Sequence, residues 1–476
     1  MFVSKEQRLP HFWEAIVSLF SLVIGIMLSI VVYGTDPHIP MLLGVFVAAL
    51  VGYRAGYSWD LIQEGMLKGI SNSLQAIVIL LIIGILIGVW IVTGVVPTLL
   101  YYGLKILSPE IFLPAAVVIC AITSLATGTS WGTTGTIGVA LMGIGAGLGF
   151  PLPVVAGAVL SGAYFGDKMS PLSDTTNLAP AMAGTDIYTH IRHMTYTSGV
   201  AFALTLAIEI GLGFFYGGGE EDLAAVQEIL ATLERDFTVG PWHVIPAILV
   251  IVCAYRKYPA IPGLVAGVLS AVVLGVIFEG TSYPELLEVG YAGYASNTGV
   301  EAVDSLLSKG GFTSMLYAIS IVIVAMMFGG IMEQTNQLKV IVDRILRLAT
   351  SNASLISSTV LTCLGANLVL CDQYMAIVMG GRMYAQAYRD RGLHPKNLSR
   401  AVEDSATVTA NLVPWNSGGA YQAATLGVAT IAYLPFNFFC WLSPLVTLFF
   451  GWTGWTIAPA DKTEAERAEA KTAPAE

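Results

Sequence analysis

The sequence predicts an all-α polytopic membrane protein, with about 10–12 transmembrane helices in two inverted-topology repeats that include broken or re-entrant helices. The first observation behind this prediction is composition. Of the 476 residues, 55% are hydrophobic and only 11% are charged, whereas a soluble domain carries roughly 25% charged residues. The second is a set of long apolar runs, and the third is a faint internal repeat whose polar segments interrupt those runs.

The apolar runs are long enough to cross a bilayer as helices. Residues 74–96 carry no charge, and about 20 apolar residues are sufficient to span a hydrocarbon core of about 30 Å. Residues 12–33 form a similar run after Lys5 and Arg8, without a small-residue cleavage site. We therefore expect residues 1–35 to contain an uncleaved N-terminal span that lies outside the repeats.

The formal net charge of −10 is concentrated in loops and tails. Residues 217–240 form an acidic linker, and residues 459–476 form a charged C-terminal tail. Charge clusters of this kind in a membrane protein indicate solvated segments and give no support for a nucleic-acid partner. The five cysteines form no CxxC pair and lie within or beside apolar runs, which predicts small core residues and neither disulfides nor metal ligands.

An internal repeat is visible at an offset of 243 residues. Two pairs of segments carry the alignment: SPLSD over LVPWNS, and SLATGTSW over NLVLCDQY. The alignment places Thr129 over Asp372 and Ser173 over Asn416. Transporters often contain such repeats, so the aligned positions are candidates for equivalent roles in the two halves.

The distribution of lysine and arginine predicts the orientation of the halves, because cytoplasmic loops favour these residues. It places both termini in the cytoplasm and gives span 74–96 and its counterpart 314–332 opposite directions. Residues 36–216 and 241–458 are therefore predicted to be inverted repeats joined by the external linker 217–240. This architecture is typical of secondary transporters, whose substrate site lies near the bilayer midplane at the repeat interface.

The first of four polar interruptions is TSLATGTSWGTTGT, residues 123–136. Non-helical backbone persists at membrane depth only where it is buried in protein or lines a cavity. The hydroxyl oxygens of Thr127, Thr129 and Ser130 are hard ligands suited to Na⁺. Close helix packing through small residues is the alternative. The GTSWG stretch also matches the GxSxG elbow of hydrolases, but that motif needs a preceding strand, so we do not expect an enzyme.

The second interruption is GDKMSPLSDTTNLAP, residues 166–180, where two prolines break the helical pattern. We expect an unwound turn here that carries Ser170, Ser173, Asp174, Thr175 and Asn177. A carboxylate inside a membrane marks an ion or proton pathway by default, and Asp174 is the preferred ligand of this half. Asp167 and Lys168 either pair with each other in a structural role or take part in the site.

The third and fourth interruptions, residues 367–376 and 399–419, hold the carboxylates of the second half. Asp372 is the counterpart of Thr129, so one half supplies a charge where the other supplies a hydroxyl. Glu403 and Asp404 point about 100° apart on a helix, so one can face a cavity while the other faces a neighbouring helix. An anionic site that binds either a cation or protons is the physical basis of competitive antiport. The alternative is a salt bridge to Arg400 at the cytoplasmic end of the helix.

The block GTSWGTTGTIGVALMGIGAGLGFPLPVVAGAVLSGAYFGDKMSPLSDTTNLAP resembles the NhaC-type sodium/proton antiporters, as do HFWEA and VEDSATVTANLVPWNSGGAY. The resemblance covers nearly the whole chain. It implies inverted repeats with broken helices at the substrate site, and Na⁺ extrusion driven by proton influx across the plasma membrane of a prokaryote. The same family includes members that look like malate–proton/sodium–lactate antiporters, so an organic-acid exchanger is the alternative. A carboxylate substrate would need a cationic anchor, for which Lys168, Arg382 and Arg400 are the nearest candidates.

The expected ion-binding residues fall into three groups. The Na⁺ ligands are Asp174, Asp372 and Asp404, with Thr129, Ser173, Asn177 and Asn416 as neutral oxygen donors. The proton-coupling candidates are Glu403, Asp404 and Asp174. Secondary candidates are Thr127, Ser130, Asp167, Lys168 and Ser405. No cofactor is expected beyond the transported ions. The expected partners are small cations, protons and membrane lipid, with small carboxylates in the alternative, and a homodimer is left open.

Overall fold

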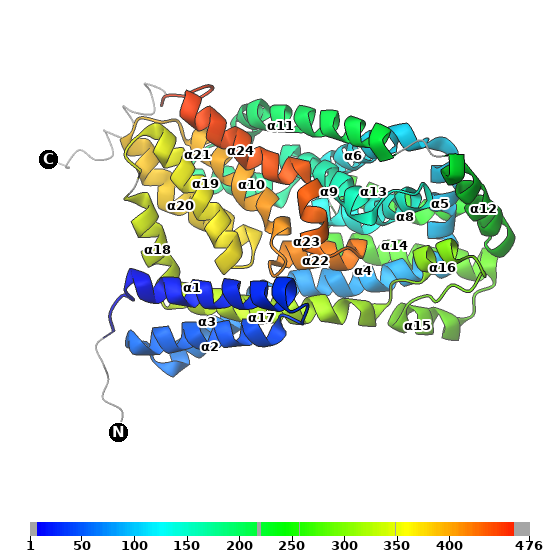
Figure 1. Cartoon of the computed structure of the whole chain (residues 1–476), viewed down its shortest axis with the longest axis horizontal. Coiled ribbons are helices and arrows are strands. Elements are labelled where there is room, and N and C mark those ends of the chain that lie inside the picture. The colour runs from blue at the N-terminus through cyan, green and yellow to red at the C-terminus, as the bar shows by residue number, and fades with distance from the viewer. Residues whose placement is uncertain (1–6, 217–219, 257, 348, 461–476) are drawn as a thin grey trace.

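The computed structural model describes residues 7–216, 220–256, 258–347 and 349–460. Within these ranges the chain is helical and contains no named strand, only one isolated bridge between Leu393 and Pro459. Most of the long helices run in a similar direction, and the first described helix begins at the same end of the molecule at which the last one ends (Figure 1). The opposite end carries α12 (Glu220–Asp236), α15 (Tyr283–Ala292) and α16 (Glu301–Leu307).

The elements of the first half alternate long helices with short breaks. In chain order they are α1 (Phe12–Met27), η1 (Leu28–Val32), α2 (His38–Arg54), α3 (Trp59–Asn72), α4 (Leu74–Val92), α5 (Val95–Ile106), α6 (Pro109–Thr127), α7 (Ser130–Thr133), η2 (Thr134–Gly138), α8 (Val139–Gly147), α9 (Leu152–Met169), α10 (Asp174–Ala183) and α11 (Ile187–Tyr216). The segments η1 and η2 are π-helical turns.

The second half has a similar succession of elements after α12. They are η3 (Pro241–Val244), α13 (Ile245–Tyr255), α14 (Ala260–Leu274), η4 (Gly275–Glu279), α15, α16, η5 (Phe312–Met315), α17 (Leu316–Gln334), α18 (Gln337–Leu346), α19 (Asn352–Val369), α20 (Gln373–Asp390), α21 (Pro395–Val402), η6 (Glu403–Thr407), η7 (Ala410–Leu412), α22 (Ser417–Leu426), α23 (Thr430–Tyr433), η8 (Leu434–Phe436) and α24 (Phe438–Thr453).

Seven helices in the described part of the chain are long and apolar enough to cross a membrane. They are Phe12–Ile30, Leu74–Val92, Pro109–Thr127, Ile187–Tyr216, Ala260–Glu279, Phe312–Gln334 and Asn352–Val369. The number rises to nine if each of two sharply bent helix pairs counts as one span. The predicted spans 12–33, 74–96 and 314–332 are thus confirmed as apolar helices, and the chain is a polytopic all-α membrane protein.

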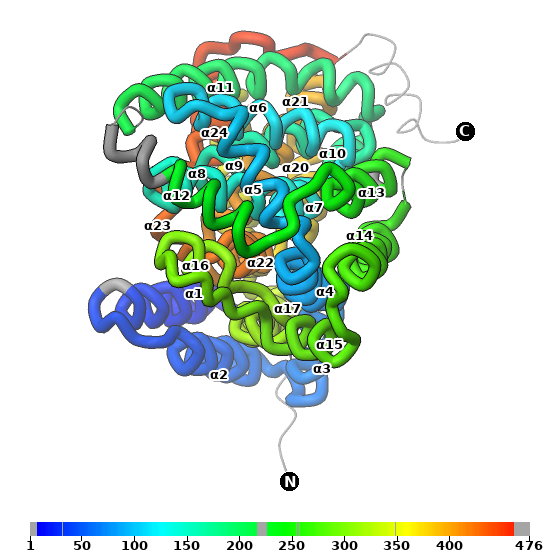
Figure 2. Tube along the Cα trace, turned by 90° about the vertical axis from the view of Figure 1, so that its right-hand side faces the viewer, coloured from blue at the N-terminus to red at the C-terminus, as the bar shows by residue number. Residues whose placement is uncertain are grey.

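The helices form layers around a central group of broken segments. Figure 2 shows α1, α2 and α3 along one side, with α17 next to them, while α11 and α24 cover the opposite side. The broken elements α7, α10, α20 and α22 lie between these layers. Polar loops are therefore enclosed by apolar helices, which is the condition for irregular backbone at membrane depth.

Each of the four predicted interruptions contains a break. Helix α6 ends before Gly128 and Thr129, and α19 ends before residues 370–372. Residues 170–173 separate α9 from α10, and residues 413–416 separate η7 from α22. The aligned pairs have the same local role, because Thr129 and Asp372 are N-caps, as are Ser173 and Asn416. The inverted topology of the halves and the cytoplasmic termini stay predictions.

Two sequence expectations need adjustment. The unwound turn in the second interruption covers only residues 170–173, because the Ser173 hydroxyl accepts a hydrogen bond from the amide of Thr176 and starts α10. Asp174, Thr175 and Asn177 therefore lie in the first turn of a helix. The predicted linker 217–240 contains α12. Its first three residues, and residues 461–476 of the predicted tail, lie outside the described part.

A glycine seam brings α3 and α17 close together. A Cβ atom at Gly69 would lie 2.0 Å from the carbonyl oxygen of Met326, and one at Gly330 would lie 2.1 Å from that of Gly65. Such distances are far inside van der Waals contact, so only glycine permits this approach. Small residues that let two backbones meet are a common means of helix association in membranes.

We expect Gly69→Ala to destabilise the protein by about 1–3 kcal/mol, because the added methyl group forces α3 away from α17. The matched control is Gly199→Ala on α11, where a Cβ atom would meet nothing within 4 Å and the higher helix propensity of alanine gives about 1 kcal/mol of stabilisation. Thermal unfolding of both variants in detergent measures the difference. Equal melting temperatures would contradict the seam.

Candidate functional site

A cavity of about 650 Å³ lies where three of the broken segments meet. Its walls come from the junction of α3 and α4, from the breaks that precede α7, α10 and α20, and from the turn between α13 and α14. Three carboxylates line it: Asp167, Asp174 and Asp372. Among the described residues that line it there is no lysine or arginine. We call it the acidic cavity.

Helix N-termini position two of these carboxylates. Asp372 is the N-cap of α20, and its side chain accepts a hydrogen bond of 3.0 Å from the amide of Met375. Its second oxygen accepts a hydrogen bond of 3.4 Å from Ser417 at the start of α22. Asp174 is the first residue of α10 and faces the cavity. Carboxylates are favoured at these positions because unpaired amides and the helix dipole both attract negative charge.

Asp167 reaches the cavity from the C-terminal end of α9. One of its oxygens accepts a hydrogen bond of 2.6 Å from Ser130. The other has no hydrogen-bond partner among the described residues, although Asp167 is only 4% exposed. Asp174 interacts electrostatically with both Asp167 and Asp372. An unpartnered oxygen in a site of negative potential is available to a cation or a proton.

The carboxylates are not close enough to form a preformed chelate. No group of three His, Cys, Asp or Glu residues within the described ranges is arranged to hold a metal ion. A Na⁺ ion in this cavity would therefore complete its oxygen ligands with hydroxyls, carbonyls or water. Thr127, Thr129 and Asn177 line the same cavity, and their role as neutral oxygen donors stays a prediction.

Tyr374 is a site residue that sequence reasoning did not single out. Its hydroxyl donates a hydrogen bond of 2.8 Å to Asp174 and so links α20 of the second half to α10 of the first. The tyrosine lies two residues after Asp372, inside the third interruption. The sequence feature that could have identified Tyr374 is its position as a polar aromatic residue close to the predicted ligand Asp372.

The backbone before the two N-caps is left-handed in both halves. Gly128 has a φ of 71° and Cys371 has a φ of 58°. A Cβ atom at Gly128 would lie 2.6 Å from Leu172, so the first half requires glycine here. In the second half a cysteine accepts the strained conformation, and its carbonyl accepts a hydrogen bond of 2.8 Å from the amide of Ser417. That bond joins the third and fourth interruptions.

Asp404 lies away from the acidic cavity, in a buried ion pair with Lys168. Both side chains are fully buried. The second oxygen of Asp404 accepts hydrogen bonds from Thr197 (2.7 Å) and from Thr447, and Lys168 donates one of 2.8 Å to Ser443. The ion-pair partner of Asp404 is thus Lys168 and not Arg400, and Lys168 does not pair with its neighbour Asp167. A cation-binding role for Asp404 stays a prediction.

Glu403 is also fully buried, on the π-helical turn η6. Neither of its oxygens has a hydrogen bond of acceptable geometry, although the hydroxyls of Thr175 and Thr407 flank it. On the same turn, the hydroxyl of Ser405 donates a hydrogen bond of 2.6 Å back to the carbonyl of Ala401. Glu403 is thus a buried carboxylate without a counter-ion among the described residues. Its proton-coupling role stays a prediction.

The remaining predicted ligands cap helices. Ser173 is fully buried, and its hydroxyl lies 3.0 Å from that of Thr175. Asn416 is buried as well: it donates to the carbonyl of Asn367 at 3.0 Å and accepts from the amide of Gly418. Neither residue is among those that line the acidic cavity. Their contribution in this state is to hold the broken segments in place.

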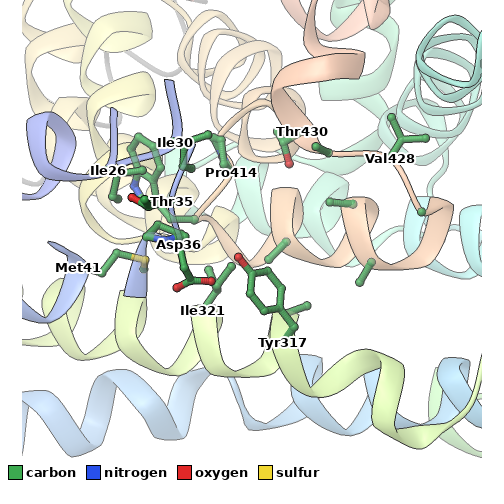
Figure 3. Close-up of a pocket in the computed structure, with 18 of the residues that line it drawn as sticks. Ile26, Ile30, Thr35, Asp36, Met41, Tyr317, Ile321, Pro414, Val428 and Thr430 are labelled. Carbon is green, nitrogen blue, oxygen red and sulfur yellow. The ribbon is translucent and has the colours of Figure 1, made fainter. Parts of the chain in front are cut away.

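A second cavity of about 630 Å³ lies beside the fourth break (Figure 3). Pro414 and Trp415 of that break line it, together with the loop that contains Asp36 and with Tyr317 of α17. Asp36 pairs with His38 at 2.5 Å. The fourth break thus lines this largely apolar cavity, and Ser417, the residue after the break, contacts Asp372.

Comparison with known proteins gives the family. The model of the "Na+/H+ antiporter family" matches residues 10–164 and 162–455. The chain belongs to the Na⁺/H⁺ antiporter family. This agrees with the resemblance seen in the sequence, and the matched ranges include all four interruptions.

Three relatives of this antiporter family are similar along nearly their whole length. The chain is 41% identical to the malate-2H⁺/Na⁺-lactate antiporter of Bacillus subtilis, over 94% of this chain and 96% of the relative. It is 37% identical to the Na⁺/H⁺ antiporter NhaC of Alkalihalophilus pseudofirmus, over 93% and 96%. It is 36% identical to the arginine/ornithine antiporter ArcD of Halobacterium salinarum, over 98% and 97%. The relatives carry different substrates, so their names alone do not select one.

We expect Lys168→Met to destabilise this antiporter by about 3–5 kcal/mol, because it leaves the Asp404 carboxylate buried without its counter-ion. The double variant Lys168→Met with Asp404→Asn removes both charges and should recover most of the loss. Thermal unfolding in lipid nanodiscs measures all four proteins of the cycle. Additive effects of the two substitutions would show that the pair is not coupled.

Proposed function

We propose that the protein is a secondary transporter that exchanges Na⁺ for H⁺ across the plasma membrane, with the acidic cavity as the site that holds either the cation or protons. The observation that carries the proposal is the lining of that cavity: Asp167, Asp174 and Asp372 face it, and no described lining residue is cationic. Such a cavity concentrates cations and excludes anions. Family membership supports the same conclusion.

Competition for one site is sufficient to couple the two ions. A Na⁺ ion bound by Asp174 or Asp372 neutralises the charge that would otherwise hold a proton, so the occupied forms exclude each other. The transporter then turns its site from one side of the membrane to the other with one ion bound, and turns it back with the other ion bound. Alternating access needs a barrier that moves. Pro414 and Trp415 of the fourth break line the cavity of Figure 3, and Ser417, which follows the break, contacts Asp372 of the acidic cavity. We assign that barrier role to residues 413–416.

The buried ion pair of Lys168 with Asp404 offers a second point of coupling. Asp167 and Lys168 are neighbours on α9, and one faces the cavity while the other pairs with Asp404. A change of charge at Asp167 therefore changes the electrostatic potential at the ammonium group of Lys168. We propose that proton binding at this ion pair and at Glu403 is linked to movement of α9 against η6.

An organic-acid exchanger is the alternative function, as in the malate/lactate relative. A cationic amino acid, as in the arginine/ornithine relative, is a further competitor, because the acidic cavity suits any small cation. We expect Na⁺ alone to dissipate an imposed pH gradient in proteoliposomes, followed by an internal pH-sensitive dye. If dissipation requires malate, lactate, arginine or ornithine, Na⁺/H⁺ exchange is not the function.

We expect Asp174→Asn and Asp372→Asn each to lower Na⁺-dependent proton flux by at least about 100-fold, because each removes a charge that the cation needs. The matched control is Asp60→Asn on the exposed start of α3, which should keep normal flux. Size-exclusion profiles verify that the variants are folded. Near-normal flux in both cavity variants would remove the acidic cavity as the ion site.

A further inference from the structure

A third cavity, of about 340 Å³, has the opposite electrostatic character. It lies between the later turns of α4, the loop at residues 292–294, the loop at residues 308–310 and the C-terminal end of α22. Lys309 lines it, and no aspartate or glutamate is among its described lining residues. We call it the Lys309 cavity. It adjoins the cavity of Figure 3, since both include Ser314, Ala424 and Gly427.

Lys309 is half-buried, and its side chain forms no ion pair or hydrogen bond with any described residue. Burial lowers the pKa of Lys309 from its ordinary value. A lysine that loses water without gaining a partner carries an energetic cost that an anion would offset. The ammonium group of Lys309 therefore has no negatively charged partner among the described residues.

Two consecutive glycines fix the position of Lys309. Gly310 and Gly311 both have a φ of 86°, and the amide of Gly311 donates a hydrogen bond of 2.7 Å to the carbonyl of Gly84 on α4. A Cβ atom at Gly310 would lie 2.3 Å from the backbone nitrogen of Gly88. The loop is thus pressed against α4, and the lysine that precedes it has little freedom to leave the cavity.

Thr425 and Ser308 carry hydroxyl groups and line the cavity together with the lysine. Thr425 is only 5% exposed, and its hydroxyl forms no hydrogen bond of acceptable geometry with a described residue. The hydroxyl of neighbouring Tyr421 donates to the carbonyl of Trp131 at 2.7 Å. The Ser308 hydroxyl accepts from the amide of Ser296 at 3.0 Å, which leaves its own proton free to donate. A buried, unpartnered hydroxyl needs an explanation, and a bound acceptor supplies one.

The closest acidic loop does not neutralise the site. Asp304 accepts hydrogen bonds from the hydroxyls of Ser296 (2.7 Å) and Thr298 (2.9 Å) and from the amides of Thr298 and Gly299. These donors hold the pKa of Asp304 below its ordinary value, and the carboxylate forms no ion pair with Lys309. The same turn holds Ser296 against Ser308, so the acidic residue organises the rim of the cavity without filling it.

We propose that the Lys309 cavity binds a small carboxylate, with the ammonium group of Lys309 and the hydroxyls of Thr425 and Ser308 as donors to its oxygens. An ammonium group and hydroxyl donors, in a cavity with no carboxylate among its described lining residues, are the chemistry that recognises an anion. The volume exceeds what one inorganic ion needs, and apolar side chains such as Ile87 and Met315 offer a wall for a short carbon chain. A mono- or dicarboxylate fits both features.

This site is separate from the acidic cavity and goes beyond the proposed cation exchange. Helices α4 and α22 connect the two. Ile79 of α4 lines the acidic cavity and Ile87 lines the Lys309 cavity, which corresponds to about 12 Å along a helix. The first residue of α22 contacts Asp372, and its last residues line the Lys309 cavity. Occupancy of one cavity can therefore influence the other through two shared helices.

Direct binding tests this inference without any ion flux, so its failure and the failure of the proposed exchange are separate results. Purified protein is titrated calorimetrically with choline malate and choline lactate, against choline chloride, choline phosphate and the neutral amide of malate. We expect saturable binding of a carboxylate and none of the neutral amide. Absence of carboxylate binding, or equally tight binding of chloride or phosphate, would overturn the assignment.

Variants then locate the site. We expect Lys309→Gln to weaken carboxylate binding by at least about tenfold, Thr425→Val by about threefold, and Lys309→Arg to retain most of the affinity. The matched control is Lys339→Gln, an exposed lysine on α18, which should bind like the original protein. Unchanged affinity in both Lys309→Gln and Thr425→Val would show that the carboxylate binds elsewhere.

Discussion

The buried ion pair of Lys168 with Asp404 is the interaction on which the centre of the protein depends. It joins α9 to η6, and the hydroxyls of Thr197 and Thr447 bring α11 and α24 to the same carboxylate. Four elements that are distant in sequence thus meet at two side chains. Charges removed from water are costly unless they are paired and hydrogen-bonded. The polar contacts therefore leave these helices few alternative packings.

The backbone requirement of a membrane interior shapes the rest of the site. Broken helices leave amides without intrahelical partners, and in hydrocarbon each must find one inside the protein. Thr129, Ser173, Asp372 and Asn416 satisfy those amides as N-caps. The residues that cap the breaks include residues that face the acidic cavity, so structural need and ion chemistry use the same side chains.

The positions of the helix breaks were predictable from local pattern. The polar interruptions located all four breaks, and the repeat alignment paired the N-caps correctly because an N-cap has a strong residue preference. The partner of Asp404 was not predictable, since Lys168 lies 236 residues away and no local signal selects it among the candidate cations. Thr197 and Thr447 lie in helices without a motif. Lys309 was missed because a single lysine in a loop shows its isolation only when the packing around it is known.

The glycine seam between α3 and α17 limits how the molecule can change shape. The backbones of the two helices are so close at Gly65, Gly69 and Gly330 that sliding by a fraction of a turn would drive carbonyl groups into each other. The side of the molecule built from these helices should therefore behave as a rigid frame. Any rearrangement that exposes the acidic cavity alternately to the two sides must then take place in the capped segments, which move against this frame as a separate body.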